Sequence, residues 1–221
     1  MTEGAAPDEG LVDYYQRRAK EYEAIYARPE RQADLAALRS LIGGRFEGTQ
    51  VLEVACGTGY WTQVIAGVAK AVVATDLAQE PMAIARTKRY ARQNVVFAEA
   101  DAYALEASLG TFDAAFAGFW WSHVPRERVE EFIASLHARL ERGARVLLVD
   151  NIYVEGISTP VAGIDAAGNT YQMRRLGDGS RVRVLKNFVS EGELRERLAK
   201  HASSFRFTAL QYYWLAEYAA Q

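Results

Sequence analysis

Several features that mark particular protein classes are scarce in this sequence. A single cysteine, Cys56, among 221 residues excludes an internal disulfide framework and cysteine-rich zinc sites, and indicates a reducing compartment such as the cytoplasm. The longest apolar run, residues 114–121, is far shorter than the ~20 residues of a membrane-spanning helix. Residues 1–10 contain no basic residue and no apolar stretch, so we expect a loose end and no secretory signal.

An excess of charge of one sign is also missing. The 26 basic and 28 acidic residues give a net charge of -2, so no overall field favours binding to nucleic acid. Half of the residues are hydrophobic and 24% are charged, which is typical of a globular domain with a sizeable core. We therefore expect one soluble domain, with no metal site and with neither nucleic acid nor membrane as a partner.

Between residues 50 and 150, apolar segments of strand length alternate with helix-periodic segments. The expected strands are 50–54, 71–75, 95–99, 112–117 and 144–150, and the clearest helix runs over 126–142, between Pro125 and Gly143. Strands that are apolar throughout are typical of a parallel sheet covered on both faces. The pattern predicts an α/β fold with a doubly wound sheet.

The flanking segments carry further signals. Helices are expected at 11–26, rich in tyrosine and a candidate lid, and at 29–42; residues 156–168 are expected to form a loop. An antiparallel hairpin is expected from the segments 170–176 and 181–188. A capped helix is expected to begin at Ser190 with Glu193, and one or two closing strands are expected within 206–218. The domain then divides into a helical lid (1–44), a core (48–151), a loop and hairpin insertion (155–188), and closing elements (189–221).

The turn after the first expected strand contains Gly57-x-Gly59. In doubly wound sheets this turn and the helix after it bind a nucleotide. Thr62 stands where the dinucleotide fingerprint has glycine or alanine, so a ligand without phosphates fits better. Asp76 and Asp101 end the next two strands, where carboxylates can accept hydrogen bonds from ribose hydroxyls and from an exocyclic amine. The sequence therefore predicts a nucleoside site.

These elements, in this order, resemble the class I S-adenosylmethionine-dependent methyltransferases over about residues 48–151. The resemblance implies a mostly parallel seven-stranded sheet, S-adenosylmethionine as methyl donor and S-adenosylhomocysteine as product. The N-terminal segment looks like the lid helix of small-molecule methyltransferases, because it contains Tyr14-Tyr15 and Glu21-Tyr22. The segment 156–188 departs from the family pattern. The expected cofactor-binding residues are Tyr14, Tyr22, Glu53, Ala55, Gly57, Gly59, Asp76, Leu77, Asp101, Ala102 and Phe119.

Aromatic and polar residues near the carboxyl ends of the strands are candidates for the substrate side. His123 follows the fourth strand, where a base could take a proton from the acceptor; the alternative is that it orients the turn before Pro125. A base is not required, because positioning alone can supply about 7–11 kcal/mol. One of Trp120 and Trp121 is expected to line the pocket. The substrate candidates are Tyr15, Trp120, Trp121, His123, Asn151, Tyr153 and Tyr171.

The expected hairpin is basic. Its positive charges could attract an anionic substrate or a polyanion, but the alternation of Arg181 and Arg183 with Val182 and Val184 favours a solvated face. The basic residues are Arg174, Arg175, Arg181, Arg183 and Lys186, with Asp178 as the one acidic residue.

We predict an enzyme that transfers a methyl group from S-adenosylmethionine to a nitrogen or oxygen atom of a small molecule by in-line displacement, as a monomer or homodimer. Three alternatives stay open on the sequence. They are a nicotinamide-dependent oxidoreductase, a non-catalytic nucleoside-binding protein and a methyltransferase acting on a macromolecule.

Overall fold

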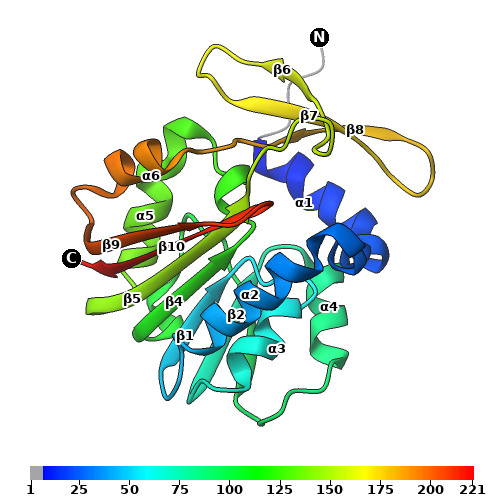
Figure 1. The fold of residues 1–221 in the computed structure, drawn as a ribbon. Coiled ribbons are helices and arrows are strands. Elements are labelled where there is room, and N and C mark those ends of the chain that lie inside the picture. Colours follow the sequence, from blue (N-terminus) through cyan, green and yellow to red (C-terminus); the bar gives the residue numbers. More distant parts are fainter. Residues whose placement is uncertain (1–6) are drawn as a thin grey trace.

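A seven-stranded sheet forms the centre of the computed structural model, which describes residues 7–221 (Figure 1). The strand order is β3-β2-β1-β4-β5-β10-β9, with β1 to β5 parallel and β10 antiparallel to both β5 and β9. The predicted doubly wound, mostly parallel sheet is thereby confirmed. The strands are β1 (Gln50–Val54), β2 (Ala71–Asp76), β3 (Val95–Glu99), β4 (Phe112–Gly118), β5 (Leu140–Asn151), β9 (Ala202–Ala209) and β10 (Tyr213–Ala220).

Helices lie on both faces of this sheet (Figure 1). On one face, α2 (Gln32–Gly43) and α3 (Tyr60–Ala66) pack on apolar strand residues such as Val51 and Phe116. On the other face, α5 (Val129–His137) and α6 (Glu191–Leu198) pack on Leu52 and Leu148. Successive strand residues point to opposite faces, so the continuous apolar strands supply two cores, one on each side. The helix α4 (Gln79–Thr87) follows β2.

The segment before the core is helical but not one α-helix. The helix α1 (Pro7–Arg18) continues as a 3₁₀ helix over Ala19–Ala27, and a short 3₁₀ turn at Pro29–Arg31 precedes α2. The expected loose end over residues 1–10 is wrong from Pro7 onward, where α1 begins; residues 1–6 lie outside the described residues. Other 3₁₀ turns are Ala107–Leu109, Trp121–His123 and Arg126–Arg128.

The predicted hairpin is part of a three-stranded antiparallel sheet. Its strands are β6 (Val161–Ile164), β7 (Thr170–Arg175) and β8 (Arg181–Leu185), so the expected loop 156–168 is wrong where β6 forms. The short β6 has an exposed, glycine-containing sequence, and only its pairing with β7 makes it a strand. Tyr14 of α1 packs with Leu176 and Val184, and thus α1 lies against this sheet.

The helix predicted over 126–142 is also shorter than expected. α5 ends at His137, and Leu140 begins β5. Gly143, expected to end the helix, has φ +85° within β5, where the pairing with β4 shifts register between Phe112 and Ala114. Glycine allows this bulge because it adopts positive φ without a Cβ clash. An apolar residue such as Leu140 is compatible with either the helix or the strand. It belongs to the strand because it pairs with Phe112 of β4.

Two smaller expectations are confirmed. The side chain of Ser190 accepts a hydrogen bond from the backbone N–H of Glu193 at 3.2 Å, and Glu193 accepts one from the backbone N–H of Ser190 at 2.9 Å, which completes the capping box of α6. The closing segment forms the two strands β9 and β10. Within residues 7–221, no helix has the length and apolarity needed to cross a membrane.

Gly59, at the start of α3, should not tolerate a side chain. Its φ is +77°, and an added Cβ would lie 2.9 Å from the Cβ of Ala85 and 2.7 Å from the hydroxyl of Tyr90. We expect Gly59→Ala to lower the free energy of unfolding by about 2–4 kcal/mol, measured by urea denaturation. The control is Gly10→Ala, in α1 with open space around it, which should be neutral or stabilising. Equal effects of the two substitutions would contradict this account.

Candidate active site

The turn between β1 and α3 is built from left-handed residues and is fixed by Asp76. Ala55, Gly57 and Gly59 have φ values of 55°, 55° and 77°. One carboxylate oxygen of Asp76 accepts the backbone N–H of Gly57 at 2.7 Å, and the other accepts that of Ala78 at 2.8 Å. No atom lies within 4 Å of a Cβ built on Gly57, so the turn leaves space for a ligand beside its backbone.

A narrow cavity of about 90 Å³ opens beside this turn, at the carboxyl ends of the parallel strands. Leu11, Val12 and Tyr15 of α1 line it from the other side. Eight predicted cofactor residues line this cavity, namely Tyr22, Ala55, Gly57, Asp76, Leu77, Asp101, Ala102 and Phe119. The other three do not: Tyr14 faces the small sheet, Glu53 is buried, and Gly59 packs against α4.

Phe119 has a backbone conformation that bulky residues rarely adopt. It follows Gly118 at the end of β4 with φ +62°, and its N–H donates to the carbonyl of Val149 at 2.6 Å. Among the described residues, three non-glycine residues have positive φ, and two of them, Ala55 and Phe119, line the narrow cavity. A strained backbone conformation of this kind persists only where many surrounding contacts hold it, and such conformations are concentrated at functional sites.

Glu53 is only 1% exposed. Burial, together with the nearby Asp76 carboxylate, raises the pKa of Glu53 to about 8. The carboxyl is therefore mostly protonated at neutral pH, which avoids a buried, unpaired charge under the glycine turn.

The raised pKa of Glu53 makes stability depend on pH. Because the folded protein holds this proton more tightly than the unfolded chain, the stabilisation is full below pH 4.5 and is lost as the pH rises through about 8. Over this window the wild-type free energy of unfolding should fall by about 1.4 kcal/mol per pH unit relative to Glu53→Gln, measured by urea denaturation. Parallel pH profiles for the two proteins would show that Glu53 titrates normally.

A second, wider cavity of about 370 Å³ adjoins the first. It lies between α1, the segment that follows α1, the end of β5 and the small sheet. The two cavities share four lining residues, Tyr15, Tyr22, Phe119 and His123. These four side chains therefore mark the junction where contents of the two cavities could meet.

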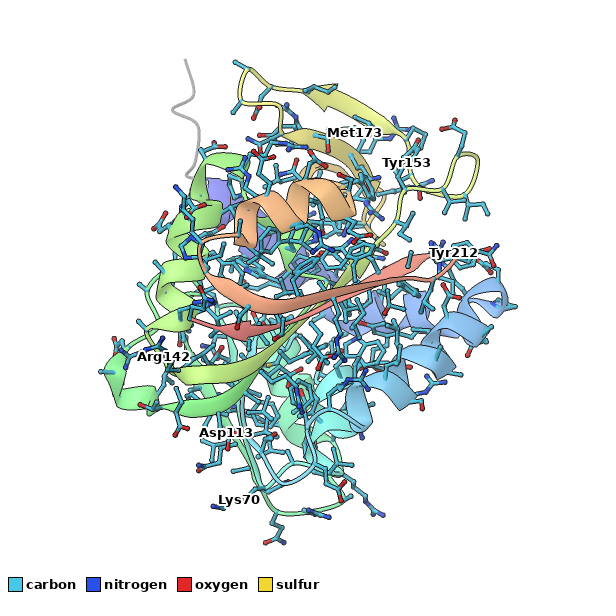
Figure 2. All side chains as sticks on the ribbon, turned by 60° about the vertical axis from the view of Figure 1, so that its left-hand side comes forward. Lys70, Asp113, Arg142, Tyr153, Met173 and Tyr212 are labelled. Atoms are coloured by element: carbon cyan, nitrogen blue, oxygen red, sulfur yellow. The ribbon has the colours of Figure 1, made fainter. Side chains whose placement is uncertain are left out.

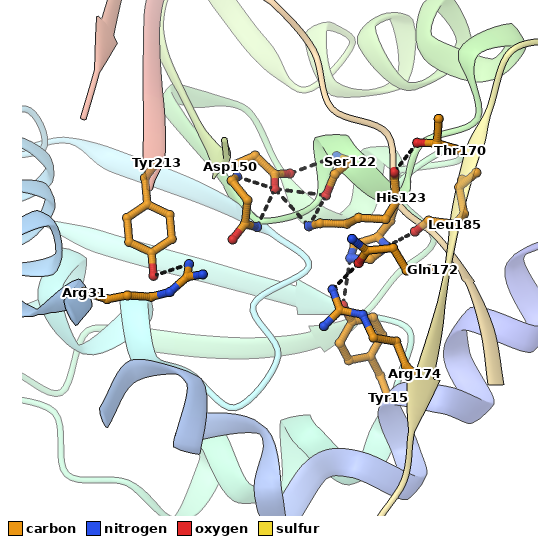
Figure 3. A network of polar contacts seen from close by, with 12 residues as sticks. Tyr15, Arg31, Ser122, His123, Asp150, Thr170, Gln172, Arg174, Leu185 and Tyr213 are labelled. Carbon is orange, nitrogen blue, oxygen red and sulfur yellow. Dashed lines mark hydrogen bonds and ion pairs between the residues drawn. The ribbon is translucent and has the colours of Figure 1, made fainter. Parts of the chain in front are cut away.

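His123 has both ring nitrogens engaged at this junction (Figure 3). Its Nδ1 lies 2.7 Å from the carbonyl of Leu185, which can only accept, so Nδ1 carries the proton. Nε2 then accepts from the Tyr15 hydroxyl at 2.8 Å. Burial, with repulsion from Lys186, lowers the pKa of His123 to about 3. The imidazole is thus neutral, in one tautomer, and held in place from two sides.

A buried ion pair holds the turn that carries His123. Lys186 Nζ lies 3.1 Å from an oxygen of Asp150, and the two side chains are 6% and 1% exposed. Ser122 donates its backbone N–H and its hydroxyl to Asp150 at 2.8 and 2.9 Å, and Lys186 donates to the same hydroxyl at 2.5 Å. Burial alone would raise the pKa of Asp150, but Lys186 keeps it below its usual value.

The sequence did not single out this ion pair. Asp150 ends the expected strand 144–150, where it could contact substrate or simply end the strand, and Lys186 belongs to the basic residues for which a solvated face is favoured. That expectation holds for Arg175, Arg181 and Arg183, which are exposed. It is wrong for Arg174 and Lys186, which line the wider cavity.

The predicted substrate residues divide into two groups. Tyr15, Trp120, His123 and Asn151 line one or both cavities. The other three lie away from both. Trp121 is buried in the core beside Phe132. The ring of Tyr153 packs edge-on against the ring of Phe188. The hydroxyl of Tyr171 donates a hydrogen bond to Asp165 at 2.9 Å. In the described part of the chain, no three His, Cys, Asp or Glu residues gather as metal ligands would.

The neutral state of His123 can be tested without a substrate. We expect the His123 imidazole to stay in the Nδ1–H tautomer from about pH 7 down to about pH 5, because burial disfavours its charged form. Nitrogen NMR of the histidine side chains should show this, and Tyr15→Phe should shift the Nε2 resonance by removing its hydrogen bond. Protonation with a midpoint near pH 6.5 would contradict this and restore His123 as a candidate base.

The sheet, the glycine turn and the two adjoining cavities define an α/β protein with a nucleoside-type site next to a second ligand site. A family model described as a methyltransferase domain matches residues 51–143. The solved DhpI-SAM-HEP complex is 32% identical, with a TM-score of 0.79 over 98% of this chain and 99% of that chain. The DhpI-SAH complex is also 32% identical, with a TM-score of 0.77 and 96% of each chain covered. This chain belongs to the S-adenosylmethionine-dependent methyltransferases.

A more distant solved structure shares the fold, and a curated relative matches part of the chain. Magnesium protoporphyrin IX methyltransferase from Synechocystis PCC 6803 is 16% identical over the whole of both chains and shares the fold, with a TM-score of 0.68. Demethylmenaquinone methyltransferase from Shouchella clausii is 35% identical over 83 residues, which are 35% of either chain. The chain thus spans only about a third of that curated relative.

The protein is therefore an enzyme, and S-adenosylmethionine is its cofactor. This assignment decides against the nicotinamide-dependent oxidoreductase and against the non-catalytic nucleoside-binding protein.

Proposed function

We propose that this enzyme transfers the methyl group of S-adenosylmethionine to an oxygen or nitrogen atom of a small molecule. The observation that carries the proposal is the junction of the two cavities at Tyr15, Tyr22, Phe119 and His123. A nucleoside cofactor in the narrow cavity and an acceptor in the wider one would face each other there. The wider cavity, about 370 Å³, is within the usual size range of small-molecule pockets.

The residues of the narrow cavity fit the cofactor. The open space at Gly57 allows a ligand to approach the backbone closely. Asp76 and Asp101 offer carboxylate oxygens at the ends of neighbouring strands, suited to hydroxyl and amine donors. The ring faces of Tyr15, Tyr22 and Phe119 can attract a cation at the junction.

When bound, S-adenosylmethionine supplies a methyl group on a positively charged sulfur, which keeps the electron pair of the broken bond. The new bond forms between the methyl carbon and an oxygen or nitrogen atom of the acceptor, which supplies the electron pair. The chain's own residues hold the two reactants in line, because positioning is the main contribution to such a displacement.

The protonation states at the junction favour a heteroatom acceptor. His123 is neutral with Nε2 engaged by Tyr15, and burial raises the pKa of Tyr15 well above its ordinary value. Neither group is poised to remove a proton from carbon at neutral pH. Oxygen and nitrogen acceptors react through a lone pair that they already carry, and the proton of a hydroxyl or amine acceptor leaves to water once the new bond has formed.

The assignment of Asp76 to the cofactor is tested by titration calorimetry with S-adenosylhomocysteine. We expect Asp76→Ala to weaken binding at least about tenfold, because a carboxylate acceptor and the anchor of the glycine turn are lost together. The matched control is Asp113→Ala, which removes a carboxylate that accepts the backbone N–H of Gln50 at 2.8 Å. Asp113 lies at the end of the molecule opposite the small sheet (Figure 2), so near-wild-type affinity is expected there. Unchanged affinity in Asp76→Ala would refute its role.

The proposed reaction itself is tested with S-adenosylmethionine labelled in its methyl group. The purified enzyme is incubated with pools of small hydroxyl and amine compounds and, separately, with total RNA and with protein. Label in a small molecule, at oxygen or nitrogen, is the expected result. Label transferred only to RNA or protein would favour a macromolecular acceptor and overturn the proposal.

A further inference from the structure

We propose that the wider cavity binds an acceptor that carries a small oxyanion, such as a carboxylate or a phosphate group. The inference rests on the proposed function, since it assigns the wider cavity to the acceptor. It goes further by naming the chemical class of that acceptor and the residues that recognise it.

The charge of the cavity lining carries the argument. The cationic side chains that line it are Arg18, Arg28, Arg31, Arg174 and Lys186, whereas none of its described lining residues is an aspartate or glutamate. The chain as a whole has a net charge of -2, so this positive charge is a local property of the cavity. A concave site lined by charge of one sign concentrates ligands of the opposite sign.

Three of the four arginines of the cavity donate hydrogen bonds to neutral partners. Arg174 donates to the side-chain oxygen of Gln172 at 2.5 Å, Arg31 to the Tyr213 hydroxyl at 3.2 Å and Arg18 to the Tyr14 hydroxyl at 2.6 Å. Among residues 10–221, whose side chains the structure describes, Lys186 is the one cation of the cavity with a carboxylate partner.

Some arginines outside the cavity have carboxylate partners. Arg17 pairs with Asp178 at 2.7 Å, and Arg45 with Glu217 at 3.1 Å. Other arginines outside the cavity have no carboxylate partner among the described residues either, such as Arg39, which donates to the Tyr60 hydroxyl at 2.6 Å. The cavity is distinguished by the five cations gathered on one concave lining whose described residues include no aspartate or glutamate.

The cavity cations also repel one another. Burial lowers the pKa of Arg174, and the charges of Arg18 and Arg28 lower it further. Burial likewise lowers the pKa of Lys186 in spite of Asp150, with Arg174 adding to the effect. Partly buried charges without counter-ions are costly, and a bound anion would relieve both the burial cost and the repulsion.

The guanidinium groups are held ready for such a ligand. Arg31 and Arg174 extend toward the same space from opposite sides of the cavity (Figure 3). The Arg31 guanidinium lies 5.0 and 5.3 Å from the ring centres of Tyr212 and Tyr213, which restrict its position. The planar guanidinium fork matches the oxygens of carboxylate and phosphate groups, and preorientation reduces the entropy lost on binding.

The test is calorimetric titration of the enzyme, saturated with S-adenosylhomocysteine, with inorganic phosphate, with acetate and with acetamide. Acetamide matches acetate in shape and lacks its charge. We expect phosphate and acetate to bind and acetamide to bind at least about tenfold more weakly than acetate. Arg174→Gln should weaken phosphate binding at least about tenfold, the loss of one charge-assisted contact, and Arg174→Lys should restore part of it.

The matched control is Arg175→Gln, the next residue on β7, whose side chain is exposed and lies outside the cavity lining. It should bind phosphate as the wild type does. Arg28→Gln, at an exposed lining position, serves as a second variant if Arg174→Gln does not fold.

Failure of the inference and failure of the proposed function give different results. Normal S-adenosylhomocysteine binding without phosphate or acetate binding would overturn the oxyanion site, as would equal losses in Arg174→Gln and Arg175→Gln. Acetamide binding as tightly as acetate would also overturn it. Label transferred only to macromolecules in the preceding assay would overturn the proposed function instead.

Discussion

The buried ion pair between Lys186 and Asp150 is the interaction on which the second half of the site depends. It joins the segment after β8 to the carboxyl end of β5, and through Ser122 it fixes the turn that presents His123. Removing one partner of such a pair would leave an uncompensated buried charge, a cost of several kcal/mol. The small sheet therefore forms the outer wall of the wider cavity and is tied to the core by more than apolar packing.

The narrow cavity depends on a different constraint, the close approach of backbone segments at the carboxyl edge of the parallel sheet. Asp76 ties the turn after β1 to the turn after β2, while Gly59 lets α3 pack closely on α4. The strained backbone of Ala55 and Phe119 faces the same narrow cavity. Rigid elements on both sides maintain this geometry, as a site that must position two reactants requires.

The chemistry of the site follows from what its polar groups can do in these surroundings. Burial keeps His123 and Tyr15 neutral and hydrogen-bonded to each other, so they form a fixed wall at the junction. The cations beyond them are charged groups whose partners are largely neutral. The junction is thus aromatic and neutral, and the wider cavity beyond it is strongly positive, in keeping with the proposed separation of cofactor and acceptor.

The sequence by itself determined the parallel core and the glycine turn at its carboxyl edge. A strand, a glycine turn and a helix are local events, so 50–54, Gly57 and Asp76 could be recognised from neighbouring residues. Tertiary structure alone decided several other features. The strand β6 exists through its pairing with β7, Leu140 joins a strand through its pairing with Phe112, and Trp120 rather than Trp121 lines the narrow cavity. The positively charged wider cavity combines Arg18, Arg31 and Arg174 from separate segments. The physical reason is that burial and charge environment arise from contacts between residues far apart in the chain, which local periodicity does not encode.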